Sequence, residues 1–340
     1  MNATILLGDA LARLAEVPDK SVQCVVTSPP YWGLRDYGHD NQFGLEATPA
    51  QYVENMVSVF REVRRVLADD GTLWLNLGDS YVGGKGQSGQ GDPENQARRA
   101  AAGESINQPH HQIGGKQRTR PTDDLRMLRG TGLKPKDLVG IPWRVAFALQ
   151  DDGWYLRQDI IWAKPNSMPE SVKDRCTKSH EYLFLLSKSP KYFFDSDAIQ
   201  EPAVATTLHD FTGTGYAAPG QSPQTGNRDA TKSGNEYQFT GTRNKRDVWT
   251  IPTQPFKGAH FAVMPEALVT PCVLAGSREG DTVLDPFAGS GTVGVVALRH
   301  QRDFIGIELN PEYAEMAQRR IEDDAPMLNV VSQYLSAEAK

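Results

Sequence analysis

Four consecutive residues, Ser28-Pro29-Pro30-Tyr31, combine groups that could hold a planar ring bearing an amino group. They follow the apolar run Val22–Thr27, which predicts a buried strand. Two prolines stop that strand and fix the backbone beyond it. Because proline has no backbone N–H, the loop offers mainly acceptors, the Ser28 hydroxyl and the Pro29 carbonyl, beside the aromatic face of Tyr31. We therefore predict a catalytic role for all four residues, with an ordinary Pro-Pro turn as the alternative for this motif taken alone.

A second motif lies far away in the sequence. Thr282–Asp285 predicts a strand that runs into a turn of small residues and then into a helix beginning at Val293. Glycines let the backbone approach a ligand closely, and the helix offers free N–H groups at its amino end. The apolar segment before Glu308 places a carboxylate where it could accept both ribose hydroxyls. The pattern predicts a site for a nucleotide-like cofactor, formed by Asp285, Pro286, Phe287, Ala288, Gly289, Ser290, Gly291, Thr292 and Glu308.

Together the two motifs resemble the permuted beta group of DNA amino-methyltransferases, which use S-adenosyl-L-methionine. In that family the catalytic tetrapeptide comes early and the glycine turn comes late, as in this chain. Other segments also resemble the family: Gly8-Asp9, Arg65–Asn76, Gly153–Asn166, Ser179–Leu186, Arg246–Trp249 and His260–Glu266. The resemblance implies further cofactor contacts at Asp9, His260, Phe261 and Asn310.

The expected fold is α/β, with a Rossmann-like, mostly parallel sheet flanked by helices, a circularly permuted motif order and polar insertions. We expect strands at Val22–Thr27, Thr72–Leu77, Leu156–Ala163, Tyr182–Ser187, Thr282–Asp285 and Phe304–Glu308, and helices at Pro49–Leu67, Pro142–Asp151, Glu266–Ala275, Val293–His300 and Pro311–Glu322. The expected division is a catalytic half (1–80 and 137–198), a basic insertion (81–136), a candidate target-recognition region (199–245), a cofactor-binding half (246–325) and a C-terminal tail (326–340).

Charge is the observation that argues against a nucleic-acid partner. The 340 residues carry a net charge of −6, whereas proteins that hold phosphates usually present a basic face. The distribution is uneven, because nine basic and three acidic residues fall between Arg98 and Lys136. That polar, glycine-rich insertion is either a solvated loop or an arm that contacts phosphates. The second insertion has balanced charge, and only its position between the family motifs marks it as the recognition region.

Three cysteines, Cys24, Cys176 and Cys272, show neither zinc-ligand spacing nor a disulfide framework, so we expect no metal. Pro271-Cys272 resembles the nucleophile of cytosine C5 methyltransferases. There the cysteine follows the glycine turn, whereas Cys272 precedes it and falls in a helical pattern that predicts burial. No apolar stretch is long enough for a signal peptide or a membrane span, so we expect a cytoplasmic protein that does not enter the membrane.

The resemblance implies methyl transfer from S-adenosyl-L-methionine to a base that has been flipped out of double-stranded DNA. Serine at the first position of the tetrapeptide resembles the cytosine-N4 enzymes, whereas aspartate is more typical of adenine-N6 enzymes. We expect N4 of cytosine, with N6 of adenine as the alternative. More distant alternatives are an RNA or protein-glutamine methyltransferase and a cofactor-binding regulator without turnover. A homodimer and a companion restriction endonuclease are left open.

Overall fold

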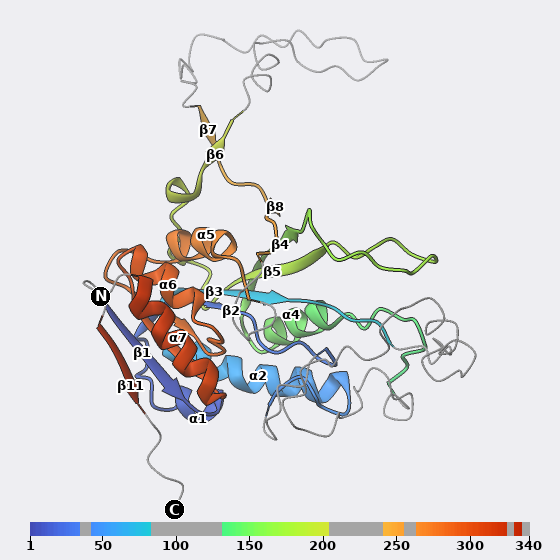
Figure 1. The fold of residues 1–340 in the computed structure, drawn as a ribbon, viewed down its shortest axis with the longest axis horizontal. Helices are drawn as coiled ribbons and strands as arrows, with labels where there is room; N and C mark the ends of the chain where they lie inside the picture. Colours follow the sequence, from blue (N-terminus) through green and yellow to red (C-terminus); the bar gives the residue numbers. More distant parts are fainter. Residues whose placement is uncertain (35–41, 83–130, 204–240, 255–262, 325–329, 335–340) are drawn as a thin grey trace, which may run out of the picture.

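The computed structural model describes residues 1–34, 42–82, 131–203, 241–254, 263–324 and 330–334 (Figure 1). Within this part of the chain the main sheet has nine strands in the order β11-β1-β10-β9-β2-β3-β5-β4-β8. Only the pairs β3–β5 and β4–β5 are antiparallel among those the structure describes in this sheet, so the sheet is mostly parallel, as predicted. In sheet order the strands are Val330–Tyr334, Asn2–Leu7, Asp303–Glu308, Thr282–Asp285, Val22–Thr27, Leu67–Leu77, His180–Ser187, Tyr155–Ala163 and Val248–Thr250.

Helices cover both faces of this sheet. One layer contains α1 (Ala10–Leu14), α2 (Pro49–Val66) and α4 (Ile141–Asp151), and the other contains α5 (Glu266–Gly276), α6 (Thr292–Arg299) and α7 (Pro311–Asp324). The buried side chains form two cores, one with each layer, and Figure 1 shows α5 and α2 on opposite sides of the sheet. Strand β2 contributes to both, because Val25 belongs to the α2 core while Cys24 and Val26 belong to the α5 core. Burial on both faces explains why this strand is a continuous apolar run.

The sheet has a topological switch point between β9 and β2. Strand β9 continues through α6 to β10 on one side, and β2 continues through α2 to β3 on the other. The two strands are parallel neighbours, with Val25 paired to Leu284. Ligand crevices in open α/β sheets form outside the carboxyl ends of strands at such a point. Both predicted loops, Ser28–Tyr31 and Pro286–Gly291, leave the sheet there, although they are far apart in the sequence.

The predicted elements are present, with differences at their ends. The largest is β3, which begins at Leu67 because its pairing with β2 shifts register between Val22 and Cys24. Strands β1, β8 and β11 were not predicted, nor was the short pair β6 (Glu201–Pro202) with β7 (Thr242–Arg243). Most of the two predicted insertions lies outside the described residues, at 83–130 and 204–240. In the described residues, no helix has the length and apolar character needed to cross a membrane.

Candidate active site

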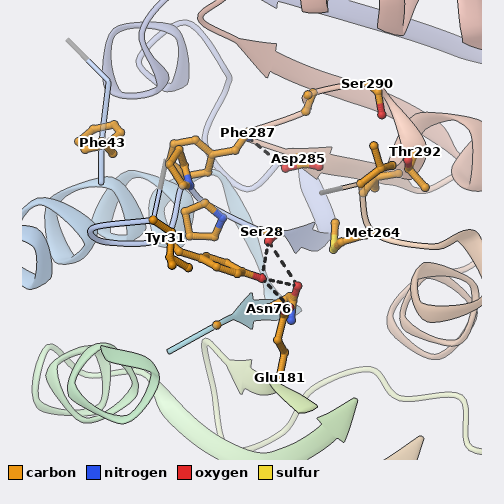
Figure 2. A pocket seen from close by; sticks show the side chains of 18 of the residues that line it. Ser28, Tyr31, Phe43, Asn76, Glu181, Met264, Asp285, Phe287, Ser290 and Thr292 are labelled. Carbon is orange, nitrogen blue, oxygen red and sulfur yellow. Dashed lines mark hydrogen bonds between the residues drawn. The ribbon is translucent and has the colours of Figure 1, made fainter. Parts of the chain in front are cut away.

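A cavity of about 740 Å³ lies at the switch point and is lined by both predicted motifs (Figure 2). The loop after β2 forms one wall and the loop after β9 another. The ends of β1, β3 and β10 and the loop between β4 and β5 also contribute to its lining. Such a volume is typical of sites for small molecules and cofactors.

Ser28 and Tyr31 meet Asn76, from the end of β3, inside this cavity. The Ser28 hydroxyl lies 3.3 Å from Asn76 Oδ1 and 3.2 Å from the Tyr31 hydroxyl oxygen. The Tyr31 hydroxyl is 2.8 Å from Asn76 Oδ1. Asn76 Nδ2 donates to the Tyr182 carbonyl at 3.0 Å, which orients the amide so that its oxygen faces the two hydroxyls. Asn76 is therefore an acceptor for this loop.

Tyr31 also reaches a charged pair. Its hydroxyl lies 2.8 Å from Glu181 Oε2, and the other carboxylate oxygen of Glu181 accepts from Lys164 Nζ. The Lys164 ammonium in turn lies 4.1 Å from the centroid of the Trp162 ring. Since Tyr31 has one hydroxyl proton, it can donate to either Glu181 or Asn76 at a given moment. When it donates to Glu181, the proton of Ser28 can go to Asn76.

Two further contacts fix the loop. The Tyr52 hydroxyl on α2 donates to the Pro30 carbonyl at 3.0 Å. Gly78, directly after β3, lies against the Tyr31 ring so closely that a Cβ there would be 2.5 Å from Cε2 of the ring. The position of Tyr31 thus depends on glycine at residue 78.

Asp285 joins the catalytic loop to the cofactor loop. It is 2% exposed, and its Oδ1 accepts from the Thr27 hydroxyl at 2.6 Å and from the Phe287 N–H at 3.0 Å. Burial raises the pKa of Asp285 to about 7, against the lowering effect of these two hydrogen bonds. The aspartate at the end of β9 therefore holds the residue before Ser28 in place.

Glu308 is fixed by two backbone donors. Its Oε2 accepts from the Gly289 N–H and its Oε1 from the Asn310 N–H, each at 2.8 Å. Burial raises the pKa of Glu308 above its usual value. The carboxylate thus connects the turn after β9 with the end of β10, and it remains part of the cavity wall.

Nearly all the predicted site residues in the described part of the chain line this cavity. The set is Asp9, Ser28, Pro29, Pro30, Tyr31, Asp285, Pro286, Phe287, Ala288, Gly289, Ser290, Thr292, Glu308 and Asn310. Gly291 is the exception: it has φ +76°, and a Cβ there would lie 2.9 Å from Cβ of Ala317, so it serves helix packing. The hydroxyls of Ser290 and Thr292 accept from Arg320 at 3.2 and 2.8 Å. The predicted contacts His260 and Phe261 lie outside the described residues.

Sequence reasoning missed Asn76, Gly78, Lys164 and Glu181 as site residues, although all four line the cavity. The usable signal was a polar residue at the end of an apolar strand, which applies to Asn76. Lys164 similarly follows β4, and Glu181 lies near the start of β5. Nothing local marks Gly78, because its role depends on a ring 47 positions earlier in the numbering.

The residues present fit a nucleoside cofactor with a charged amino-acid end. Glu308 offers a fixed carboxylate for ribose hydroxyls, and Asp9 offers a second one at the cavity wall while capping α1 through the Ala12 N–H. Phe287 provides an apolar face and contacts Phe43 edge to face, with ring centroids 5.8 Å apart. The loop after β9 has small residues that leave room for a ligand. In the described residues, no group of three or more His, Cys, Asp or Glu could hold a metal ion.

Cys272 is placed away from this chemistry. It is fully buried on α5, and its thiol donates to the Leu268 carbonyl at 3.2 Å. Burial raises the pKa of this thiol well above its ordinary value. A buried thiol that resists ionisation is not a nucleophile.

Comparison with known proteins gives the family. The DNA methylase model for N6 and N4 enzymes matches residues 22–319. Type II methyltransferase M.Cfr9I of Citrobacter freundii is 47% identical over 323 residues, which cover 95% of this chain and 89% of that protein. Type II methyltransferase M.SmaI of Serratia marcescens is 47% identical over 320 residues, covering 94% and 91%. The chain belongs to the DNA methylase family of N6 and N4 enzymes. It is a DNA methyltransferase, and S-adenosyl-L-methionine is the methyl donor of this class.

Solved structures agree with the fold. PvuII DNA methyltransferase, which is cytosine-N4-specific, superposes with a TM-score of 0.57 at 18% identity, covering 96% of this chain and 93% of that one. A putative DNA modification methylase from Thermus thermophilus, TTHA0409, complexed with S-adenosyl-L-methionine, gives 0.56 at 22% identity, covering 97% and 99%. The methyltransferase fold expected from the permuted motif order is thus confirmed.

Proposed function

We propose that this enzyme transfers a methyl group from S-adenosyl-L-methionine to the exocyclic N4 of a cytosine flipped out of double-stranded DNA. The observation that carries the proposal is the serine at the first catalytic position, whose hydroxyl lines the cavity within hydrogen-bond distance of Asn76 and Tyr31. The Ser28 proton can go to Asn76 Oδ1, 3.3 Å away, which leaves lone pairs of Ser28 to accept an N–H from the base. The Pro29 carbonyl is the proposed second acceptor.

The two acceptors orient the amino nitrogen. In the planar amino group the lone pair of this nitrogen is delocalised into the ring, which makes the nitrogen a poor nucleophile. Two acceptors that hold its N–H bonds favour a tetrahedral geometry, in which the lone pair can attack the methyl carbon. When bound, S-adenosyl-L-methionine supplies a methyl group on a cationic sulfur that is open to in-line displacement. Asp9, Asp285 and Glu308, with the turn Pro286–Thr292 and with Asn310, are proposed to hold that cofactor. His260 and Phe261 remain predicted contacts.

The methylated nitrogen must release one proton. Ser28, Tyr31 and Glu181 form a chain of oxygens that leads away from the acceptor site, with separations of 3.2 and 2.8 Å. We assign this chain as the route by which the proton leaves, ending at the Glu181 carboxylate that pairs with Lys164. The Tyr31 ring is the proposed stacking surface for the base.

The domain division also stands as a proposal, with 1–80 and 137–198 as the catalytic half, 246–325 as the cofactor-binding half and 326–340 as a tail. The basic insertion 81–136 would contact phosphates, and 199–245 would recognise the target sequence. Because relatives such as M.SmaI are named Type II methyltransferases, we propose a companion restriction endonuclease. A cytoplasmic location remains a prediction, and a homodimer is left open.

Mass spectrometry of nucleosides tests the base assignment. Plasmid DNA is incubated with the full-length protein and S-adenosyl-L-methionine carrying a labelled methyl group, and is then digested to nucleosides. We expect labelled N4-methylcytosine. Labelled N6-methyladenine would refute the cytosine assignment while keeping the methyltransferase chemistry. Sequencing of the methylated plasmid then maps the target site.

A further inference from the structure

The loop between β4 and β5, residues 164–179, forms part of the cavity wall. Figure 1 shows it projecting beyond the ends of the two strands. Asn166, Ser167, Met168 and Glu170 from this loop line the cavity. Met168 is also 83% exposed, the highest value among the exposed large hydrophobic residues in the described part of the chain. A side chain that both lines a cavity and is open to solvent stands at the mouth of that cavity.

The exposure of Met168 does not result from a loosely attached loop. Asn166 and Thr253 exchange two hydrogen bonds of 2.9 Å, which fix the loop just before Met168. Beyond Met168, Glu170 pairs with Arg175, whose guanidinium lies 4.0 Å from the centroid of the Tyr81 ring. The loop is braced on both sides of an apolar side chain that nothing in the described part of the chain covers. Isolated exposed hydrophobic residues are common, so it is the position at the cavity mouth that sets Met168 apart.

The substrate of this enzyme class explains such a position. A base within a duplex cannot reach an enclosed site of this kind, so it has to leave the stack and lose its stacking and pairing. Proteins that kink DNA frequently insert an apolar side chain, methionine included, between base steps. Methionine suits this role because it is long, flexible and polarisable.

We propose that Met168 enters the DNA helix at the position vacated by the flipped base and stabilises the extruded state. The partner is double-stranded DNA, and the contact is with the bases that flank the gap. This inference rests on one part of the proposed function, namely that the cavity accepts the flipped base. It does not depend on whether that base is cytosine or adenine.

The test compares two duplexes that contain the mapped target site. In one the target base is paired, and in the other it lies opposite an abasic position, where flipping no longer breaks a base pair. Methyl transfer is measured as kcat/KM for full-length wild type, Met168→Ala, Met168→Leu and Val172→Ala. Val172 is the matched control, because it is 40% exposed on the same loop but does not line the cavity.

We expect Met168→Ala to lose about tenfold in kcat/KM on the paired duplex and less than about twofold on the abasic one, since only the first requires the pair to be broken. Met168→Leu should recover most of the loss, and Val172→Ala should match wild type on both. An equal loss on the two duplexes would place Met168 against the base inside the cavity and overturn the proposal, as would unchanged activity on the paired duplex. If wild type labels adenine, the cytosine assignment fails while this comparison is run unchanged on the adenine site.

Discussion

Replacing Gly78 by alanine should inactivate the enzyme by moving Tyr31. The added methyl group would lie 2.5 Å from Cε2 and 2.7 Å from Cδ2 of the Tyr31 ring. Ordinary van der Waals contact begins at 3.4 Å, so the ring would have to retreat by about 0.9 Å. A shift of that size would take the Tyr31 hydroxyl, which now lies 2.8 Å from both Asn76 Oδ1 and Glu181 Oε2, out of hydrogen-bond range of these two acceptors.

The expected loss follows from the displacement. A misplacement of about 1 Å in a catalytic group can reduce turnover about 100-fold, equivalent to about 2.7 kcal/mol of transition-state stabilisation. The assay is single-turnover methylation of the mapped duplex at saturating S-adenosyl-L-methionine, with cofactor affinity measured by calorimetry. We expect the rate to fall and the cofactor affinity to stay within about twofold, because Gly78 contacts the tyrosine and the proposed cofactor contacts lie across the cavity.

A second background isolates the cause. In a Tyr31→Leu variant the ring is absent, so adding Gly78→Ala should reduce the residual rate by less than about threefold, a strongly non-additive pair. Tyr31→Phe provides the intermediate case, in which the ring stays and only the hydroxyl is lost. A Gly78→Ala enzyme that turns over within about threefold of wild type would show that the position of Tyr31 is not critical, and the reasoning would be refuted.

Two further predictions concern the cofactor loop. The raised pKa of Asp285, about 7, means that the folded state binds this proton more tightly than the unfolded chain, so its contribution to the free energy of unfolding is greatest in acid and falls as pH rises from about 4 to about 7. Asp285→Asn keeps an acceptor for Thr27 and Phe287. In urea titrations the free energy of unfolding of this variant, relative to wild type, should rise by up to about 1.4 kcal/mol per pH unit in that window. A difference that does not change with pH would contradict a raised pKa at Asp285. Glu308→Gln should weaken S-adenosyl-L-methionine binding by more than about tenfold in calorimetry, because an NH2 group replaces one of the two carboxylate oxygens proposed to accept from the ribose hydroxyls. The exposed Glu312→Gln is its control, and equal affinities for the two variants would mean that Glu308 only ties the loops together.

Strand β2, strand β9 and the helix after the glycine turn could be predicted because their signals are local. Val22–Thr27 is an apolar run stopped by two prolines. Helix α6 begins directly after the glycine turn, with Gly291 as its N-cap residue. Strand β8 is only three residues long and has no periodicity of its own, so its pairing with β4 gives no sequence signal. The early start of β3 at Leu67 depends on a register shift against β2, which is a property of the pair.

The partners of Tyr31 illustrate the limit for the site. Sequence reasoning identified the aromatic face as the useful part of this residue, whereas the structure ties its hydroxyl to Asn76 and Glu181. Those partners lie 45 and 150 residues further along the chain, so only the folded sheet brings them together. The acidic residue comes from β5, which is antiparallel to β3 and therefore presents its amino end where β3 presents its carboxyl end. An alternation of strand and helix does not predict that reversal.

The parallel pairing of β2 with β9, together with the Thr27–Asp285 hydrogen bond at their ends, explains why the permuted order of the two motifs does not change the site. The chemistry needs the loop after β2 and the loop after β9 to leave the sheet side by side, and parallel neighbouring strands guarantee this whichever strand comes first. The bond of 2.6 Å joins residues 258 positions apart and fixes the residue before Ser28 to the aspartate that opens the cofactor turn. A displacement of the cofactor turn is thereby transmitted to the acceptor loop through this buried contact, in addition to the pairing of the two strands. Asp285 should accordingly affect methyl transfer as well as cofactor binding, unlike Glu308, whose two backbone partners both lie on the cofactor side.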